Sequence, residues 1–245
     1  MKKKIKITIE YDGHDYAGWQ KQPNAASIQQ KIEEALFSVF KQKISIHGAG
    51  RTDAGVSAFG QVAHFELDST IEAEKIKFAI NTKLAKDIRI IKSEQVDDDF
   101  HARYLALGKH YRYIIYNDDV SSAIDRNNTY HVKQPLDIEK MQVAAKHFVG
   151  THDFTAFCAA GSDVDCKVRT IAMMAIRKDD KRIIIDVEGN GFLYNMVRII
   201  VGTLVDVGVG KIAPSNINDI IASKDRKSAS ATAGASGLCL VKVLY

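Results

Sequence analysis

Apolar and polar residues alternate at the start of the chain, and the pattern changes to a helical spacing further on. Isoleucines alternate with polar residues from Lys4 onward, which is the period of a strand with one buried face, so we expect a strand over residues 4–12. Ser27 and Gln30 form a capping box before apolar positions at helical spacing, which predicts a helix over residues 28–40. Further segments predict strands over 42–49 and 59–66, a helix over 71–84 and a strand over 87–93.

The second half of the chain repeats this order of elements. Asp137 and Gly150 are typical start and stop signals, and they predict a helix over residues 137–149. The other predicted elements of this half are strands over 107–116, 168–177, 182–189 and 238–244 and a helix over 192–207. Both halves therefore follow the order βαββαβ, the ferredoxin-like arrangement with a four-stranded antiparallel sheet and helices on one face.

These patterns predict an α+β protein built from two tandem ferredoxin-like βαββαβ units. We place the boundary near residues 96–107 and assign residues 1–103 to an N-terminal subdomain and 104–245 to a C-terminal one. Antiparallel sheets in both units are expected to form a central cleft. The duplication is inferred from the order of elements and not from identity between the halves.

The helix predicted over 192–207 is apolar on most sides. Its polar positions form one narrow stripe that includes Asn195, Arg198 and Asp206, so we expect a buried helix with a partly buried guanidinium. A buried guanidinium without an anionic partner costs several kcal/mol as an order of magnitude, and Asp53 is a candidate partner. Hydrogen bonds to loop carbonyls, or a bridge to a surface acid, are the alternative.

The segment GRTDAGVSA places Asp53 in a short polar loop, two residues after Arg51 and between glycines. Turn formation alone accounts for most loops of this composition, because Asx side chains bond nearby backbone and glycine tolerates positive φ. Here, however, predicted strands flank the loop on both sides. Loops on rigid scaffolds are frequent sites of binding and catalysis, so Asp53 and Arg51 are candidate functional residues.

Composition excludes several classes of protein. The chain has 245 residues, 46% of them hydrophobic and 26% charged, and its apolar runs are too short to cross a bilayer, so we expect a cytoplasmic protein without membrane association. Three cysteines without a C-x-x-C pair argue against a disulfide framework or a zinc ribbon. The eight histidines show no metal-ligand spacing, so no metal site is predicted.

A net charge of +4 is too small to indicate a polyanionic partner by itself, but the distribution of charge is more informative. Arg103, Lys109 and Arg112 fall in a segment without acidic residues and are interleaved with tyrosines such as Tyr111. Cations beside aromatic rings suit contact with phosphates and stacking on bases, which makes these residues candidates for RNA binding. An ordinary exposed strand with alternating faces is the alternative.

Motifs for other chemistries are missing from the sequence. VGVGK at residues 207–211 lacks the flanking residues of a Walker loop, and there is no G-x-G-x-x-G after a strand and no G-x-S-x-G elbow. A loop aspartate, a buried arginine and a basic aromatic strand together suit covalent catalysis by a carboxylate on a flipped-out base. A carboxylate glycosidase is the competing class, although it needs a second acid that the sequence does not indicate.

Motifs along the whole chain resemble the pseudouridine synthase A family, which isomerises uridine in transfer RNA. The resemblance rests on YDGHDYAGWQ at 11–20, GRTDAGVSAFGQ at 50–61, DDFHARYLALGKHYRY at 98–113, HDFTAF at 152–157, MVRIIVGTLVDVG at 196–208 and GLCL at 237–240. It implies the pseudouridine synthase fold and a homodimer that acts without cofactor or metal. It also implies that uridines at positions 38, 39 and 40 of the tRNA anticodon stem-loop are the substrate.

The resemblance assigns roles to individual residues. Asp53 matches the catalytic aspartate that attacks the target nucleotide, on the base or on the sugar. Arg51 matches the residue that helps to extrude the base, and Tyr111 the tyrosine that packs on the uracil and suits proton transfer. Arg198 matches the arginine that pairs with the aspartate, and Leu238 the apolar wall of the pocket.

Two positions depart from the family pattern, and two other functions stay open. Ser57 stands where the family usually has histidine, and Gly234 where it often has proline. We expect these changes to affect RNA contacts or packing and to leave the chemistry intact. A tRNA-binding protein without activity and a carboxylate N-glycosidase on nucleic acid are the alternatives, and the second would release free uracil.

Overall fold

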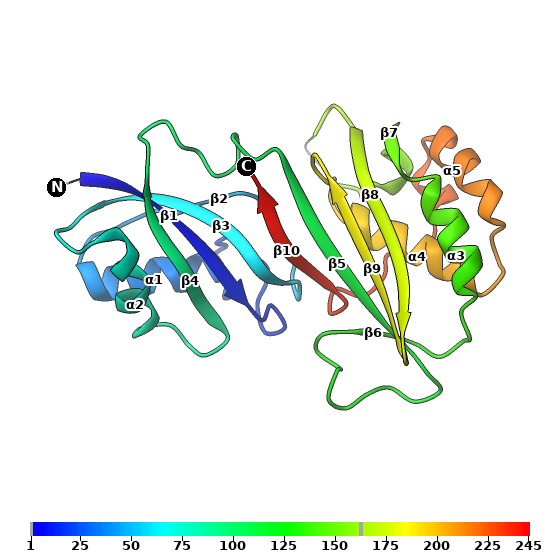
Figure 1. Cartoon of the computed structure of the whole chain (residues 1–245), viewed down its shortest axis with the longest axis horizontal. Coiled ribbons are helices and arrows are strands. Elements are labelled where there is room, and N and C mark those ends of the chain that lie inside the picture. The colour runs from blue at the N-terminus through cyan, green and yellow to red at the C-terminus, as the bar shows by residue number, and fades with distance from the viewer. Residues whose placement is uncertain (1, 162–163) are drawn as a thin grey trace. The chain divides into compact units, whose positions relative to one another are not determined.

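The computed structural model describes residues 2–161 and 164–245, and the chain forms two compact units (Figure 1). The first unit is Met1–Leu107 together with Cys239–Tyr245, and the second is Gly108–Leu238. The C-terminal strand therefore folds with the first unit, whereas the sequence analysis assigned it to the second subdomain.

In the first unit the strands lie in the order β4-β1-β3-β10, and β2 is also paired to β3. β1 pairs antiparallel with both β3 and β4, while β10 joins β3 in parallel. This parallel pair differs from the all-antiparallel sheet that the sequence predicts. The elements of this unit are β1 (Lys2–Tyr11), α1 (Ile28–Phe40), β2 (His47–Gly48), β3 (Ser57–Asp68), a 3-10 turn (Ala73–Lys75), α2 (Ile76–Asn81), β4 (Ile88–Val96) and β10 (Leu238–Leu244).

The core of the first unit follows directly from the sequence pattern. Every second residue of β1 from Ile5 to Tyr11 is buried, as the alternation predicts. α1 buries Ile32 and Leu36 on the face given by its helical spacing. Ser27 caps this helix as expected, because its side chain accepts a hydrogen bond from the backbone N–H of Gln30 at 3.3 Å.

In the second unit β9 lies between β5 and β8 and pairs antiparallel with both. β7 extends the sheet beyond β8, and β6 adds in parallel to β5. α3 packs against α4 and β8, as Figure 1 shows on one side of these strands. The elements are β5 (Gly108–Asn117), β6 (Tyr130–Val132), α3 (Ile138–Lys146), β7 (Gly150–Asp153), β8 (Val168–Asp179), β9 (Arg182–Gly189), α4 (Met196–Gly208) and α5 (Ile217–Ser223), with 3-10 turns at Thr155–Phe157, Pro214–Asn216 and Arg226–Ser228.

The strand predicted over 42–49 is wrong for most of its length, because only His47–Gly48 forms a strand. In this segment the backbone N–H of Ile46 donates to the carboxylate of Glu33 at 3.2 Å and not to the backbone of a neighbouring strand. β6, β7 and α5 are absent from the prediction because elements of three to seven residues carry little periodic signal. The mixed α+β class is confirmed.

Candidate active site

Asp53 opens a tight turn in the loop between β2 and β3 of the first unit. The backbone N–H of Val56 donates to the carbonyl of Asp53 at 3.2 Å, and Gly55 has a φ of +78°. A positive φ at the third position is what a type II turn requires, and glycine adopts it without strain. The glycine two residues after Asp53 therefore has a structural reason that the sequence already indicated.

Thr52 anchors this loop to the core of the unit. Its side-chain oxygen lies 2.7 Å from the hydroxyl of Tyr11 in a buried hydrogen bond, and its carbonyl accepts the N–H of Trp19 at 3.0 Å. On either side of Thr52, Arg51 is exposed and Asp53 is half-buried. Fixing the middle residue of Arg-Thr-Asp thus limits where both candidate functional side chains can lie.

Two glycines let the segment 11–20 come into close backbone contact with the loop. A Cβ on Gly13 would lie 2.0 Å from the carbonyl oxygen of Val56, and one on Gly18 would lie 2.6 Å from the carbonyl oxygen of Thr52. Any other residue would push the loop away. The block YDGHDYAGWQ is therefore the support of the Asp53 loop, a role that the sequence analysis did not assign to it.

Ser57 closes the loop from its other end. Its side-chain oxygen accepts the backbone N–H of Gly13 at 3.0 Å, which ties the start of β3 to the supporting segment. Ser57 also pairs with Cys239 of β10, so this residue contacts two segments. The serine therefore takes part in the support of the loop.

Tyr111 and Arg198 belong to the second unit, whereas Asp53 and Arg51 belong to the first. Tyr111 lies on β5 opposite Val187 of β9 and is 8% exposed. Its ring meets the edge of Phe192 at a centroid distance of 5.2 Å and an interplanar angle of 86°. This edge-to-face contact fixes the plane of the Tyr111 ring.

Arg198 lies in the first turn of α4, a largely buried helix as predicted. Its Nε donates to the carbonyl of Ala233 at 2.8 Å, and one terminal nitrogen donates to Oδ1 of Asn195 at 2.7 Å. Loop carbonyls were one alternative in the sequence analysis, and this part of it is confirmed. A guanidinium carries five N–H donors, so these bonds do not preclude an ion pair with a carboxylate.

Close contacts also hold residues 231–234, a segment that packs against α4. A Cβ on Gly202 would lie 1.9 Å from the carbonyl oxygen of Ala231, and one on Gly234 would lie 2.8 Å from the ring of Tyr130. The hydroxyl of Tyr113 donates to the carbonyl of Gly234 at 2.6 Å. This segment leads to Leu238, which is buried at the last position of the second unit.

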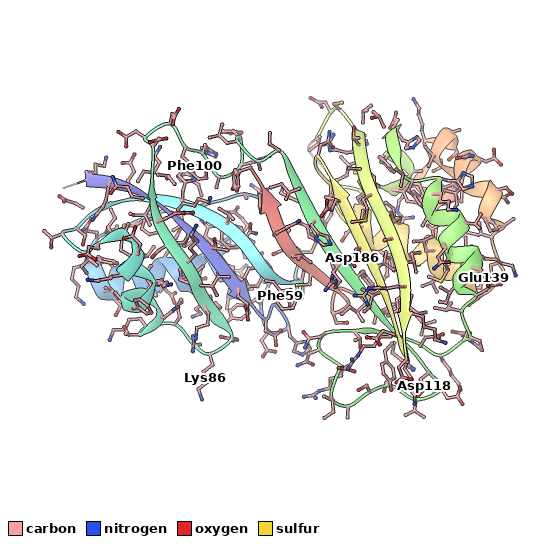
Figure 2. The ribbon with its side chains drawn as sticks, viewed as in Figure 1. Phe59, Lys86, Phe100, Asp118, Glu139 and Asp186 are labelled. Carbon is pink, nitrogen blue, oxygen red and sulfur yellow. The ribbon has the colours of Figure 1, made fainter. Side chains whose placement is uncertain are left out.

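The three candidate RNA-binding cations lie in different environments. Arg112 donates to both carboxylate oxygens of Asp186 at 2.9 and 3.3 Å, and His110 lies 2.7 Å from the same carboxylate, which Figure 2 labels on β9. Burial raises the pKa of Asp186, but the hydrogen bonds from Arg112 and His110 outweigh it and lower the pKa overall. Arg103 is exposed and Lys109 is half-buried.

Neither a metal site nor a membrane span is found in the part of the chain that the structure describes. Across residues 2–161 and 164–245, no three His, Cys, Asp or Glu side chains are grouped as metal ligands. Over the same residues, none of the helices combines the length and the apolar character that a bilayer crossing needs.

Comparisons with known proteins agree with the motifs. A family model described as tRNA pseudouridine synthase matches residues 7–105 and 144–245. The chain is 52% identical over 241 residues to tRNA pseudouridine synthase A of Acetivibrio thermocellus, covering 98% of this chain and 99% of the relative. It is also 52% identical over 244 residues to tRNA pseudouridine synthase A of Ruminiclostridium cellulolyticum, covering 99% of this chain and all of the relative, 100%.

This chain therefore belongs to the tRNA pseudouridine synthase family, which confirms the resemblance seen in its motifs. Among solved structures, a Cbf5-Nop10-Gar1 complex aligns with 96% of this chain and 57% of its own at 12% identity and a TM-score of 0.40. A similarity at that level supports no argument about the site.

Proposed function

We propose that this chain isomerises uridine to pseudouridine in the anticodon stem-loop of tRNA, at positions 38, 39 and 40, with Asp53 as the nucleophile. The observation that carries the proposal is the Asp53 turn, which is held by a buried hydrogen bond between Thr52 and Tyr11 and by close backbone contacts from the segment 11–20. A nucleophile on an otherwise mobile loop needs such support to keep a reactive geometry.

In this reaction the carboxylate of Asp53 attacks the target nucleotide, and the bond between C1′ of the ribose and N1 of uracil breaks. The uracil rotates, a bond forms between C1′ and C5, and the bond between Asp53 and the nucleotide breaks, which frees the carboxylate. The C5 proton leaves to solvent and N1 gains a proton. The reaction is an isomerisation, so it consumes no oxidant, reductant or second substrate. Arg51 helps to extrude the base, and the Tyr111 ring packs on it.

We propose that Arg198 forms an ion pair with Asp53 and keeps it ionised, with Leu238 as an apolar wall of the pocket. An adjacent guanidinium lowers the pKa of a carboxyl group, which a nucleophile in a dry pocket requires. The bonds from Arg198 to Ala233 and Asn195 fix the direction of the guanidinium. Replacing Arg198 with Lys removes that fixed geometry while it keeps the charge.

We also propose a homodimer in the cytoplasm that binds tRNA without cofactor or metal. Arg103 and Lys109 are the cations we assign to phosphate contacts. Arg112 is a weaker candidate, because Asp186 already accepts two of its hydrogen bonds. The affinity for tRNA should fall as salt rises, since each phosphate contact releases counterions.

Mapping the product tests this proposal. An unmodified tRNA transcript with uridine at positions 38, 39 and 40 is incubated with the protein, and pseudouridine is located by sequencing after chemical labelling. Matched transcripts carry cytidine at one, two or all three positions. We expect pseudouridine at these uridines and nowhere else in the tRNA. Modification elsewhere would contradict the proposed site, free uracil would indicate a glycosidase, and binding without reaction would indicate a binding protein.

A further inference from the structure

A chain of hydrogen bonds connects the start of β4 to the Asp53 turn. Asp87, the residue before β4, contacts the supporting segment twice. Its backbone carbonyl accepts the N–H of Asp12 at 2.9 Å, and its carboxylate Oδ2 accepts the hydroxyl of Tyr16 at 2.9 Å. Asp87 therefore holds both ends of the short turn formed by residues 12–16.

Tyr16 passes this restraint to the loop. Its backbone carbonyl accepts the N–H of Gly55 at 3.2 Å, and Gly55 is the third residue of the turn that Asp53 opens. Tyr16 is 8% exposed, and its own N–H donates to the carbonyl of Gly13 at 3.0 Å. Gly13 in turn donates to Ser57 on the far side of the loop. A shift of Tyr16 would thus move the contacts on both sides of Asp53.

The carboxylate of Asp87 is hydrogen-bonded to Tyr16 through one of its two oxygens. The other carboxylate oxygen of Asp87, Oδ1, is buried and has no hydrogen-bond partner among the described residues. The Tyr16 hydroxyl is the donor to this carboxylate among the described residues, so the bond at Oδ2 places the two side chains relative to each other. Burial and the nearby Asp87 raise the pKa of the Tyr16 phenol well above its usual range, which keeps it protonated as a donor.

We propose that Tyr16 and Asp87 are positioning residues that set the geometry of the Asp53 turn through the N–H of Gly55. This inference rests on the proposed function and adds two residues that act on Asp53 from a distance. We assign neither residue a contact with the substrate. Their effect is on the rate of the chemical step, since a misplaced nucleophile loses near-attack geometry while tRNA binding is retained.

The test compares variants that remove or keep the hydrogen bond. Tyr16→Phe and Asp87→Leu remove it, whereas Asp87→Asn keeps an oxygen that accepts the Tyr16 hydroxyl. Tyr245→Phe is the matched control, because it also removes one tyrosine hydroxyl of the first unit that donates a hydrogen bond. The acceptor of that bond is the carbonyl of Ala102, at 2.8 Å. The measurements are kcat and tRNA affinity, the thermal midpoint, and the hydrogen exchange rate of the Gly55 amide by NMR.

We expect Tyr16→Phe and Asp87→Leu to lower kcat by about 10- to 100-fold with tRNA affinity unchanged, and Asp87→Asn to restore kcat to within about threefold of the native value. The double variant Tyr16→Phe/Asp87→Leu should be no slower than Asp87→Leu alone, because both changes remove one interaction. The exchange of the Gly55 amide should speed up in Tyr16→Phe and stay unchanged in Tyr245→Phe.

Values of kcat for Tyr16→Phe and Asp87→Leu within twofold of the Tyr245→Phe control would overturn the inference. If Asp87→Leu does not fold, Tyr16→Phe decides, since it removes a single oxygen atom. If the native protein forms no pseudouridine, the proposed function fails, and Gly55 exchange then judges the positioning claim alone. Faster exchange in Tyr16→Phe supports it, and exchange equal to the control overturns it.

Discussion

At the scale of single residues, Thr52 is the neighbour of Asp53 that anchors the loop to the core of the first unit. The change Thr52→Val keeps the shape of the side chain and removes the oxygen that bonds to Tyr11. We expect a loss of about 1 to 2 kcal/mol in the free energy of unfolding, because the buried Tyr11 hydroxyl loses a partner. Urea denaturation measures it. Adding Tyr11→Phe to Thr52→Val should recover part of the loss, and a further loss of similar size would contradict this reading.

His64 makes the first unit sensitive to acid. Its buried ring accepts the N–H of Ala102 at 3.2 Å through Nδ1, and burial together with the nearby His101, His47 and Lys4 lowers its pKa to about 4. The unfolded chain takes up this proton near the ordinary pKa of 6.5, so the unfolded state binds more protons between these values.

Stability from His64 is therefore fully present above about pH 6.5 and is lost as the pH falls toward 4. We expect the free energy of unfolding to decrease over this range by about 1 to 3 kcal/mol, at about 1.4 kcal/mol for each unit of pKa difference. The variant His64→Asn keeps an acceptor and cannot take up the proton, so its pH dependence should be flatter. Equal slopes in both proteins would show that other groups cause the effect.

At the scale of elements, the sequence is most informative where a pattern is long. The strand predicted over 4–12 and the helix predicted over 192–207 both form, as β1 and α4. Short elements follow from tertiary contacts instead. The backbone N–H of Ile46 donates to the side chain of Glu33 and not to a neighbouring strand. The pattern of apolar residues around Ile46 does not predict this contact.

The C-terminal end of α1 can be stabilised by a substitution that the sequence pattern does not indicate. α1 ends at Lys41 with a φ of +57°, a left-handed conformation in which a side chain is disfavoured. We expect Lys41→Gly to stabilise the protein by about 1 kcal/mol. The control Lys43→Gly changes a nearby exposed lysine whose φ is not positive, and it should be neutral or destabilising. Chemical denaturation midpoints compare the two, and equal shifts would contradict the explanation.

At the scale of the whole molecule, the last seven residues, Cys239–Tyr245, complete the first unit. Cys239 and Leu240 pair with the start of β3, and the hydroxyl of Tyr245 donates to the carbonyl of Ala102. The pattern of residues predicts the strand over 238–244 but not the strand with which it pairs. A parallel pairing between segments so distant in the chain has no local signal, so β10 was assigned to the half of the chain in which it lies.

Deleting Cys239–Tyr245 tests this assignment. The deletion removes the parallel partner of β3 next to the Asp53 loop, so we expect the first unit to become sensitive to limited proteolysis while the second unit stays protected. Mass spectrometry of the fragments locates the cleavage sites. The full-length Tyr245→Phe variant serves as the control for loss of one hydrogen bond. Cleavage spread evenly over both units would show that β10 supports both.

The motifs around Asp53, Tyr111 and Arg198 could be recognised from the sequence, because each is a short run of particular residue types. Their supports could not. Thr52, Tyr16 and Asp87 are common residues whose roles depend on contacts between segments far apart in the chain. Gly13 and Gly18 are local indications of the supporting segment, since glycine often marks a close approach of two backbones.

If Asp53 is the nucleophile of an isomerase, the target uracil loses its C5 proton only when this carboxylate is present, and release of tritium from C5 follows that step. An unmodified tRNA with tritium at C5 of uracil is incubated with the native protein and with Asp53→Asn. We expect release with the native protein and a rate at least about a thousandfold lower with Asp53→Asn, while both bind tRNA with similar affinity. Release by Asp53→Asn at the native rate would contradict that role.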